Sequence, residues 1–524
     1  MRILMLTMLA IIALNVEQTT SANILALFPY PLKSHFIMFD ALLVELAKRG
    51  HNVTVVNTFP KKVPVQNYSD VDVSSCFELP SIRFELERAF SYHSSLLRDL
   101  FSYVEAYDDI LKCEPMANLM NTNDTYDLII TEIFSSDAML AYVHQFKIPF
   151  ISFCSTPLLT WASDRVGIPD NPSYISFSYN DKPLDTMGSS FFQRLYNTYA
   201  YVLSRLKYKL LSEFKTNKIV RKHFGEDTPD LEEISKNTSL IFTFSHYSIN
   251  SPRPMVPGVV EVGGIQIKEP SPLPPDIQKF MDEAEHGVIY FCLGSLLQAK
   301  TMPVEKRNAF IYAFSKIPQR VLWKYEEDDL PGKPDNVMIR KWMPQRDILA
   351  HPKVKLFIAH GGALGLNEAV YEGVPILGIP FWVDQTLNIH SVQESGAGEM
   401  LEYPDITPEV VLFKINQVLN DNKYKDNAKK LSAIYRDRAL SAMDTAVYWT
   451  EYVIRHKGAA HLKPVTVQMP WYQYLLLDIL AFYALAYFMV RRLYYKCSRA
   501  KKTMYQSRLQ RRRNMMNGHA TQVH

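Results

Sequence analysis

The sequence predicts an α/β protein with two doubly wound parallel sheets, one in each half of the chain, facing each other across a cleft. Three observations support this fold class. First, 524 residues exceed the size of one typical hydrophobic core, so we expect at least two domains. Second, short apolar runs rich in β-branched residues alternate with segments of helical periodicity in both halves. Third, a proline-dense stretch at residues 269–275 is typical of a stiff connector between domains.

The first half begins with a strand, a helix and a second strand. The strand at 24–28 leads into a proline-rich turn that contains His35, and a helix follows at 36–49. Gly50 ends that helix, and residues 51–56 form the next strand. This order predicts a parallel sheet whose ligand-binding loops lie at the carboxyl ends of the strands. Further strands are expected at 126–131, 149–153 and 240–244.

The second half repeats this alternation from Gly287 onward. Its first strand, at 288–293, ends in Gly294-Ser295. Further strands are expected at 321–324, 337–341, 356–359 and 376–379, with helices that include 303–316 and 364–371. The predicted domains are an N-terminal domain at 23–268, a linker at 269–286, a C-terminal domain at 287–445 and a helical juxtamembrane segment at 446–470.

Both ends of the chain carry targeting features. Residues 1–22 contain an arginine, an apolar run and small residues before a cleavage point, as in a secretory signal peptide. Residues 471–490 carry one charge, Asp478, and they are long enough to cross a hydrocarbon layer of about 30 Å. A basic tail follows at 491–524. By the positive-inside rule, the sequence predicts a single-pass type I membrane protein with a cytosolic tail and a luminal body.

Charge and cysteine content exclude several classes of protein. The net charge of +3 comes from the tail, which holds ten Lys or Arg and no Asp or Glu. The rest of the chain is mildly acidic, which does not suit nucleic-acid binding. The five cysteines are too few and too irregular for a disulfide framework or a metal site, although they allow one bridge, for example between Cys76 and Cys113. We therefore expect no metal and no nucleic-acid partner.

Residues 342–385 carry the strongest functional pattern. Within them, His360-Gly361-Gly362 follows an apolar strand and precedes a helix. The glycines let the backbone approach a ligand closely, and the helix N-terminus offers free N–H groups with partial positive charge. This arrangement favours binding of a diphosphate, with His360 donating a hydrogen bond to a phosphate oxygen. The alternative interpretation is an ordinary tight turn.

Residues on both sides of this turn complete a candidate nucleotide-sugar site. Trp342 lies just after a predicted strand and offers a ring on which a base can stack, with Gln345 reading the edge of that base. The alternative is a tryptophan in the core. Glu368, on the helix after the glycines, can accept hydrogen bonds from two ribose hydroxyls, or it is a solvated helix charge. Asp384-Gln385 follows the next strand and can bracket sugar hydroxyls.

Residues 342–385 resemble the signature segment of the UDP-glycosyltransferase family. The resemblance extends to residues 252–257, 262–264 and 291–295 and to the tail, so it covers essentially the whole chain. It is nearest to the membrane-bound animal branch and similar in detail to insect members. It implies two Rossmann-like domains of the glycosyltransferase B type, with the acceptor in the N-terminal half and the UDP-sugar in the C-terminal half. It also implies donor contacts from Gly294, Ser295 and the backbone near Gly365.

The resemblance further implies that His35 is a general base. An imidazole at this position can take the proton of an acceptor hydroxyl while that oxygen attacks the anomeric carbon, which inverts the centre. A carboxylate should orient the imidazole and stabilise its protonated form. The family places an aspartate where this chain has Glu132, and Asp137 follows five residues later. The sequence leaves both open, with Asp137 preferred for its chemistry.

The expected function is that of an endoplasmic reticulum membrane enzyme that moves a hexose from a UDP-sugar to a hydroxyl of a small lipophilic acceptor. Glucose is favoured over glucuronate, and the reaction serves detoxification or the conjugation of hormones or pigments. The UDP-sugar is a co-substrate, and no cofactor is expected. The alternative is a non-catalytic, membrane-anchored sensor or carrier of UDP-sugar, which the glutamate at position 132 keeps open. The sequence leaves open whether the chain forms a homo-oligomer.

Overall fold

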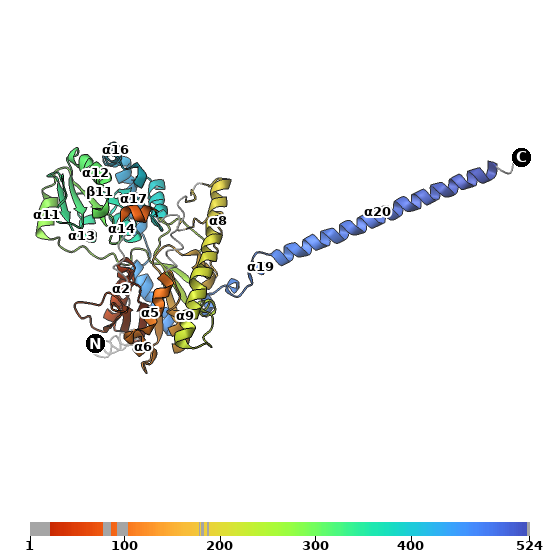
Figure 1. Cartoon of the computed structure of the whole chain (residues 1–524), viewed down its shortest axis with the longest axis horizontal. Helices are drawn as coiled ribbons and strands as arrows, with labels where there is room; N and C mark the ends of the chain where they lie inside the picture. The colour runs from red at the N-terminus through yellow and green to blue at the C-terminus, as the bar shows by residue number, and fades with distance from the viewer. Residues whose placement is uncertain are drawn as a thin grey trace, which may run out of the picture. The chain divides into compact units, whose positions relative to one another are not determined.

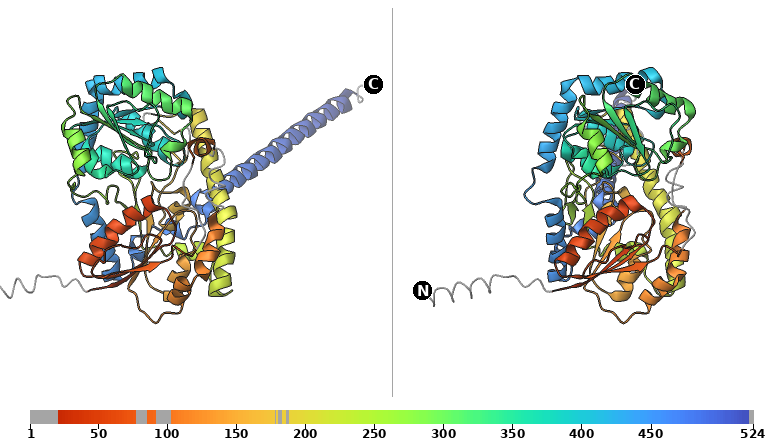
Figure 2. Two further views of the ribbon diagram at one scale, coloured as in Figure 1. Left: turned by 60° about the vertical axis from the view of Figure 1, so that its left-hand side comes forward. Right: turned by 90° about the vertical axis from the view of Figure 1, so that its left-hand side faces the viewer.

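The computed structural model describes residues 21–76, 85–91, 103–177, 179, 183–185 and 188–520. They form two compact units, the first ending at Pro464 and the second beginning at Val465 (Figure 1). The first unit contains two sheets packed against helices in two lobes (Figure 2). The expected signal peptide at 1–22 lies almost entirely outside the described residues.

The N-terminal sheet has seven parallel strands in the order β3-β2-β1-β4-β5-β6-β7. They are β1 (Asn23–Phe28), β2 (Asn52–Asn57), β3 (Tyr68–Asp72), β4 (Leu128–Glu132), β5 (Phe150–Cys154), β6 (Leu240–Thr243) and β7 (Val259–Glu261). The residues of β5 and β6 are all buried, as expected of central parallel strands covered on both faces. The predicted parallel sheet is therefore confirmed.

Helices of very different length surround this sheet. Helix α8 is the longest and begins with a capping box, in which the Gln193 amide donates to Ser190 Oγ and the Ser190 amide donates to Gln193 Oε1. The helices in the N-terminal half of the sequence are α2 (Lys33–Lys48), α3 (Leu86–Ser91), α5 (Ala106–Lys112), α6 (Glu114–Met120), α7 (Leu140–Phe146), α8 (Phe191–Lys207), α9 (Phe214–Phe224) and α10 (Leu231–Ser235), with a 3-10 turn at Thr160–Arg165 and a π-helical turn at Tyr208–Glu213. Of these, α3 packs against the core of the C-terminal sheet instead.

The C-terminal sheet has six parallel strands in the order β10-β9-β8-β11-β12-β13. They are β8 (Val288–Cys292), β9 (Arg320–Lys324), β10 (Val337–Arg340), β11 (Val354–Ala359), β12 (Ile376–Gly378) and β13 (Gly398–Met400). Its helices are α11 (Pro275–Asp282), α12 (Val304–Ser315), α13 (Gln345–Leu349), α14 (Ala363–Glu372), α15 (Gln385–Glu394), α16 (Pro408–Asn420) and α17 (Asn422–Arg436).

The structure adds elements that the sequence patterns did not predict. Strands β3, β7 and β13 were missed, and each is the outermost strand of its sheet. An edge strand pairs on one side only. Strands β7 and β13 have three residues each, and β3 is largely polar, so their apolar patterns are weak. The linker predicted at 269–286 contains a helix, α11, whose first residue is a proline. Proline suits that position because the first amide of a helix has no partner to lose.

One helix carries the chain from the second sheet back to the first. Helix α18 (Ala442–His456) packs against α2, and its Ala446, Val447 and Val453 belong to the core of the N-terminal sheet. Arg49 on the first lobe also donates to Asp444 at 3.0 Å. The predicted boundary at residue 445 therefore falls within this helix.

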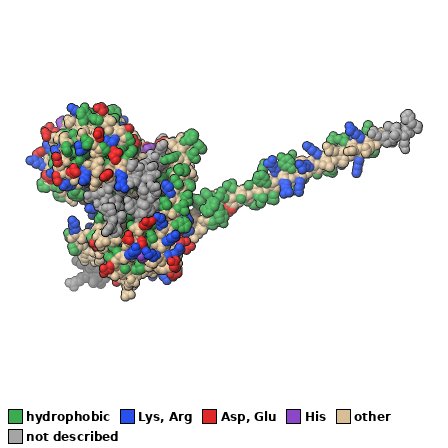
Figure 3. All heavy atoms as spheres, viewed as in Figure 1, with side chains coloured by type: hydrophobic (Ala, Val, Ile, Leu, Met, Phe, Trp, Pro, Cys, Tyr) green, Lys and Arg blue, Asp and Glu red, His purple; other side chains and the backbone are tan. Residues whose placement is uncertain are grey.

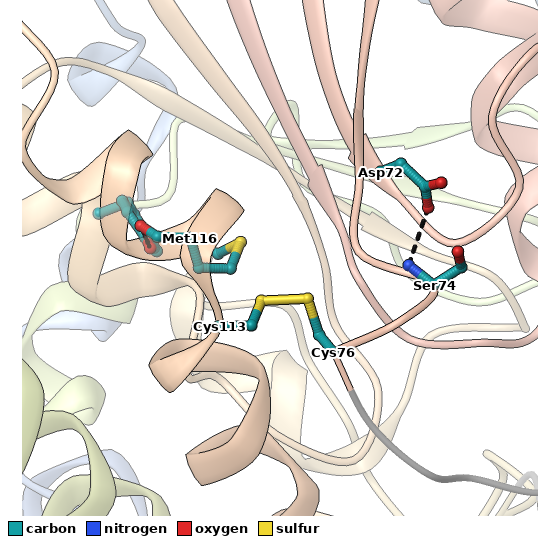
Figure 4. The surroundings of a disulfide bond; sticks show 6 residues. Asp72, Ser74, Cys76, Cys113 and Met116 are labelled. Carbon is teal, nitrogen blue, oxygen red and sulfur yellow. Dashed lines mark hydrogen bonds between the residues drawn. A yellow bond between two sulfur atoms is a disulfide. The ribbon is translucent and has the colours of Figure 1, made fainter.

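A disulfide bridge between Cys76 and Cys113 closes part of the N-terminal lobe (Figure 4). Cys76 follows β3, where the Ser74 amide donates to Asp72 Oδ1 at 2.8 Å, and Cys113 lies between α5 and α6. The bridge allowed by the sequence is thus formed, across a sequence separation of 37 residues.

The second unit contains helices α19 (Trp471–Tyr474) and α20 (Leu477–Ala520). The single helix expected at 471–490 is divided at Leu476, whose φ of 55° is incompatible with a continuous right-handed helix. Figure 3 shows hydrophobic side chains over the first part of α20 and Lys and Arg side chains along its later part. Among the described residues, no helix combines enough length with enough apolar character to span a membrane.

Candidate active site

A cavity of about 770 Å³ lies between the carboxyl ends of the two sheets. Both sheets place a topological switch point there, between β1 and β4 in one and between β8 and β11 in the other, where adjacent loops diverge and leave room for a ligand. The sequence-predicted residues that line this cavity are His35, Gly294, Ser295, Trp342, Gln345, His360, Gly362, Gly365, Glu368, Asp384 and Gln385. The structure therefore brings together residues from both halves of the chain.

His35 lies in the first turn of α2, not in the preceding loop where the sequence placed it. Its Nδ1 is 2.6 Å from Glu132 Oε1. Ser155 Oγ donates to Glu132 Oε1 at 2.9 Å and lies 2.9 Å from the same ring nitrogen. The ring also packs edge-on against Phe134. Because an ionised carboxylate only accepts hydrogen bonds, Nδ1 carries the proton directed at Glu132, and Nε2 is left as the basic atom.

Asp137, the preferred carboxylate in the sequence, occupies a different environment. Its side chain is 8% exposed, pairs with Arg165 at 2.6 Å and accepts a hydrogen bond from the Tyr208 hydroxyl. It does not line the cavity. The structure therefore corrects the preference: Glu132, the last residue of β4, is the carboxylate that contacts His35, because β4 lies beside β1 in the sheet.

His360 follows β11, and its ring is packed closely between two glycines. A Cβ atom at Gly294 would lie 2.6 Å from the ring, and a Cβ atom at Gly362 would lie 2.4 Å from it. Removal from water, with a smaller contribution from Lys324, lowers the pKa of His360 to about 4. The ring is thus neutral near pH 7. Its Nδ1 has no hydrogen-bond partner within the described part of the chain.

The turn at His360 leads directly into α14. Gly361 has a φ of 85°, in the left-handed region that favours glycine, and it does not itself line the cavity. Ala363, Leu364 and Gly365, in the first turn of α14, do line it. The unpaired amides of this turn are suited to an anion such as a diphosphate.

Trp342, Gln345 and Glu368 form one side of the cavity. Trp342 is 69% exposed, so it is not a core residue and its ring is available for stacking. Gln345 Nε2 donates to Glu368 Oε2 at 2.8 Å. Burial raises the pKa of Glu368 to about 7, and this hydrogen bond opposes the rise. Glu368 is a buried residue, so it is not a solvated helix charge.

Asp384 and Gln385 lie at the start of α15 and are both buried. Asn388 Nδ2 donates to Asp384 Oδ2 and to the Gly361 carbonyl, each at 2.9 Å, which ties α15 to the turn that precedes α14. Gln385 Oε1 accepts from the Phe381 amide, so its amide nitrogen remains for a ligand. Burial raises the pKa of Asp384, and the hydrogen bond from Asn388 opposes the rise.

Sequence reasoning missed several residues that line the cavity or contact its groups. Ser155 follows the carboxyl end of β5, and Lys324 is the last residue of β9. For both residues, the sequence signal that could have identified them was their position at or just after the carboxyl end of a strand. Arg88, on the short helix α3, also lines the cavity, but no sequence pattern marked it. Val383, which stands beside Asp384, has a φ of 58°, an unusual value for a β-branched residue.

Comparisons with known proteins agree with this arrangement. The sequence profile of the family described as UDP-glucoronosyl and UDP-glucosyl transferase matches residues 25–512. The chain is 51% identical over 468 residues to "UDP-glycosyltransferase UGT5" of Dactylopius coccus, covering 88% of this chain and 89% of the relative. It is 44% identical over 483 residues to "UDP-glucosyltransferase 2" of the same organism, covering 91% of this chain and 92% of the relative.

A solved structure shares the fold. It is a UDP-glucose: anthocyanidin 3-O-glucosyltransferase in complex with UDP, which is 17% identical, covers 84% of this chain and 100% of its own, and has a TM-score of 0.55. At that identity the likeness shows the fold alone, which is the expected glycosyltransferase B type. Taken with the family match over nearly its full length, these similarities establish that the chain belongs to the UDP-glucuronosyl and UDP-glucosyl transferase family and is a UDP-glycosyltransferase.

Proposed function

We propose that this enzyme moves a hexose, and specifically glucose, from a UDP-sugar to a hydroxyl of a small lipophilic acceptor with inversion of the anomeric centre. One observation carries the proposal: His35 from the N-terminal half and His360 and Asp384 from the C-terminal half line a single cavity. A donor held by its diphosphate near His360 would have its sugar directed toward Asp384 and His35 in one enclosed space.

In the proposed reaction, His35 Nε2 takes the proton of the acceptor hydroxyl as that oxygen attacks the anomeric carbon. Glu132 keeps Nδ1 protonated and stabilises the imidazolium that forms, and Ser155 holds the carboxylate in place. The bond from the anomeric carbon to UDP breaks on the opposite side of the ring. The charge that develops on the departing diphosphate is stabilised by the amides of the first turn of α14 and by a hydrogen bond from neutral His360.

The N-terminal wall of the cavity supports a lipophilic acceptor. It is formed largely by Tyr30, Leu32, Ile37, Met38 and Phe134, which offer apolar and aromatic surface near His35. Support for glucose comes from the name of the relative at 44% identity, a UDP-glucosyltransferase. Asp384 and the free amide of Gln385 are suited to the hydroxyls of a neutral hexose.

The proposed function is tested with membranes from cells that express the full chain. We expect UDP-glucose and a panel of phenols to give glucosides, identified by product mass, with UDP-glucuronate giving little product. His35→Ala should abolish transfer and leave UDP binding nearly intact. His223→Ala is the matched control, because His223 pairs with Asp108 and does not line the cavity, and it should retain activity. Donor binding with no transfer to any acceptor would instead support the sensor or carrier.

We also propose that the segment at 471–490 anchors the enzyme in the endoplasmic reticulum membrane with the body in the lumen and the basic tail in the cytosol. Support comes from exposed Trp471, Tyr472 and Tyr474 before the apolar residues of α20 and from Arg491 and Arg492 after them. Protease treatment of intact microsomes should remove only the tail. Extraction of the chain by alkaline carbonate would contradict the anchor.

A further inference from the structure

A cluster of metal-ligating side chains lies outside the cavity described above. His390 and Glu394 stand one turn apart on α15, and Asp185 faces them from the N-terminal half. His390 Nε2 is 3.4 Å from Asp185 Oδ1, and His390 Nδ1 is 3.6 Å from Glu394 Oε2. All three line a second, small cavity of about 70 Å³, together with Ser245 and Glu261 of the N-terminal half. The cluster therefore joins the two halves of the first unit.

From this placement we propose that Asp185, His390 and Glu394 form a binding site for a divalent transition metal, with zinc as the best-fitting ion. One imidazole and two carboxylates are donors that zinc accepts at about 2.0–2.2 Å. One ligand atom from each residue lies within 4.8 Å of the others. Ligand atoms on one tetrahedral zinc ion lie about 3.4 Å apart at such bond lengths, so the three side chains must rotate toward one another to hold the ion.

Charge and exposure also suit an ion at this position. The two carboxylates carry the charge that balances a divalent cation, and the imidazole binds in its neutral form. The side chains are 21% exposed for His390, 24% for Glu394 and 46% for Asp185. An ion can thus enter from solvent, and water can complete its coordination. Gln193 Nε2 donates to Asp185 Oδ2 at 2.9 Å, which orients this ligand and leaves Oδ1 toward His390.

The metal would act on the donor site through α15. This helix begins at Gln385, and its Asn388 holds both Asp384 and the Gly361 carbonyl. His390 and Glu394 follow on the same helix. An ion bound there fastens the donor-holding helix to the N-terminal half and so favours the arrangement in which His35 faces the donor. This regulatory consequence rests on the proposed function, whereas binding of the ion does not.

The site is tested by titrating the metal-stripped full chain with Co²⁺, whose visible absorption reports coordination, and with Zn²⁺ by calorimetry. We expect one ion per chain. His390→Gln, Glu394→Gln and Asp185→Asn should each weaken binding by about 100-fold or more, since even residues that only support a metal ligand typically contribute 10- to 100-fold. His351→Gln is the matched control, because His351 pairs with one carboxylate, Asp282, and should bind the metal as the unmodified chain does.

Each outcome decides the proposal. Unchanged binding in all three variants would mean adventitious metal and would overturn it. Weakened binding in the α15 variants with normal binding in Asp185→Asn would place the ion on α15 alone and overturn the bridge between the halves. A chain that binds no ion would also overturn the proposal. In the activity arm, zinc should lower the KM for UDP-sugar in the unmodified chain and not in His390→Gln. If no UDP-sugar is ever transferred, the proposed function fails while the binding result stands.

Discussion

At the scale of single residues, the two candidate carboxylates behave very differently although they are five positions apart. Glu132 shares a short hydrogen bond with His35 and accepts another from Ser155. Asp137 is buried in an ion pair with Arg165. A carboxylate that contacts the base acts on the rate, whereas one that neutralises a buried arginine acts on stability, because an unpaired buried charge is unfavourable.

Substitution of these two residues should separate rate from stability. Glu132→Gln should lower kcat by about 10²- to 10⁴-fold with little change in the KM for the donor, because the protonated His35 loses its counter-charge. Asp137→Asn should lower the free energy of unfolding by about 3–5 kcal/mol and leave kcat per folded molecule nearly unchanged. Steady-state kinetics and thermal unfolding measure both. A loss of kcat in Asp137→Asn at normal stability would contradict the assignment.

The raised pKa of Glu368 predicts opposite effects of pH on donor binding and on stability. Ribose hydroxyls donate to the ionised carboxylate, so the KM for UDP-sugar should rise as the pH falls below about 7. The free energy of unfolding, in contrast, should increase as the pH falls. The buried charge destabilises the fold most above pH 7, and this effect disappears as the pH falls from about 7 toward the usual value of 4.5, below which the carboxyl becomes neutral in both states.

Glu368→Gln should therefore be more stable than the unmodified chain at pH 8, by up to about 3 kcal/mol, and equally stable at pH 4. Its KM for UDP-sugar should be about 10-fold higher at pH 8, since a hydrogen bond to a charged group is lost, and should no longer depend on pH between 6 and 8. Unfolding at the two pH values and donor saturation curves test this. Equal stability at pH 8 would show that the carboxyl is not strained by burial.

At the scale of elements, the turn between β11 and α14 depends on glycine geometry. Gly361 adopts a φ of 85°, and a Cβ atom there would lie 2.7 Å from Ile389 and 3.0 Å from the Gln385 carbonyl on α15. The turn thus fits against α15, at whose start Asp384 and Gln385 lie. This close approach fixes the position of the amides at the start of α14, which we propose bind phosphate, relative to these two residues, which we propose bind the sugar.

Gly361→Ala should weaken UDP binding and destabilise the fold by about 1–3 kcal/mol, because both the backbone angle and the contact with α15 become unfavourable. Gly332→Ala is the matched control. Gly332 has a similar φ of 79°, but the nearest atom to its Cβ would be 3.8 Å away. The control should lose some stability with no change in UDP affinity. Calorimetric titration with UDP measures the affinity of each variant. Equal UDP affinity in both variants would contradict the proposed role of the turn.

At the scale of the whole molecule, long-range connections hold the first unit together. Helix α18 returns from the second sheet to pack on the core of the first, and the Cys76–Cys113 bridge ties the segment after β3 to the α5–α6 corner. Helix α3, which lies in the N-terminal half of the sequence, places Leu86 and Ala89 in the core of the C-terminal sheet, and its Glu87 accepts a hydrogen bond from Tyr403. Helices α18 and α3 cross between the lobes and limit how far the two lobes can separate.

Removal of the disulfide should lower stability without lowering intrinsic activity. Replacing Cys76 and Cys113 together by serine should reduce the free energy of unfolding by about 4 kcal/mol, the chain-entropy value for a loop of this length. Neither cysteine lines the cavity, so kcat at low temperature should be retained. Cys497→Ser, at an exposed free cysteine, should change nothing. Thermal unfolding measures the effect, and an unchanged melting temperature in the double variant would contradict it.

Much of the fold was accessible from sequence because its signals are local. Strands such as β1, β5 and β8 consist mostly of apolar residues, and glycine or proline lies close to their ends. The edge strands β3, β7 and β13 escaped notice because a short strand with one neighbour needs little apolar pattern. The candidate donor-binding residues of the C-terminal half could be found for a related reason. They lie within 342–385, where each turn follows the carboxyl end of a parallel strand.

The sequence by itself therefore determined two parallel sheets, the turn at His360 and the residues grouped around it. The tertiary structure alone decided that Glu132 rather than Asp137 contacts His35, that Ser155 joins them, and that the two histidines line one cavity. The physical reason is distance along the chain. Residues within one strand-turn-helix unit are placed by local geometry, whereas contacts between units depend on how the strands are ordered in the sheet and on the path of the chain between them.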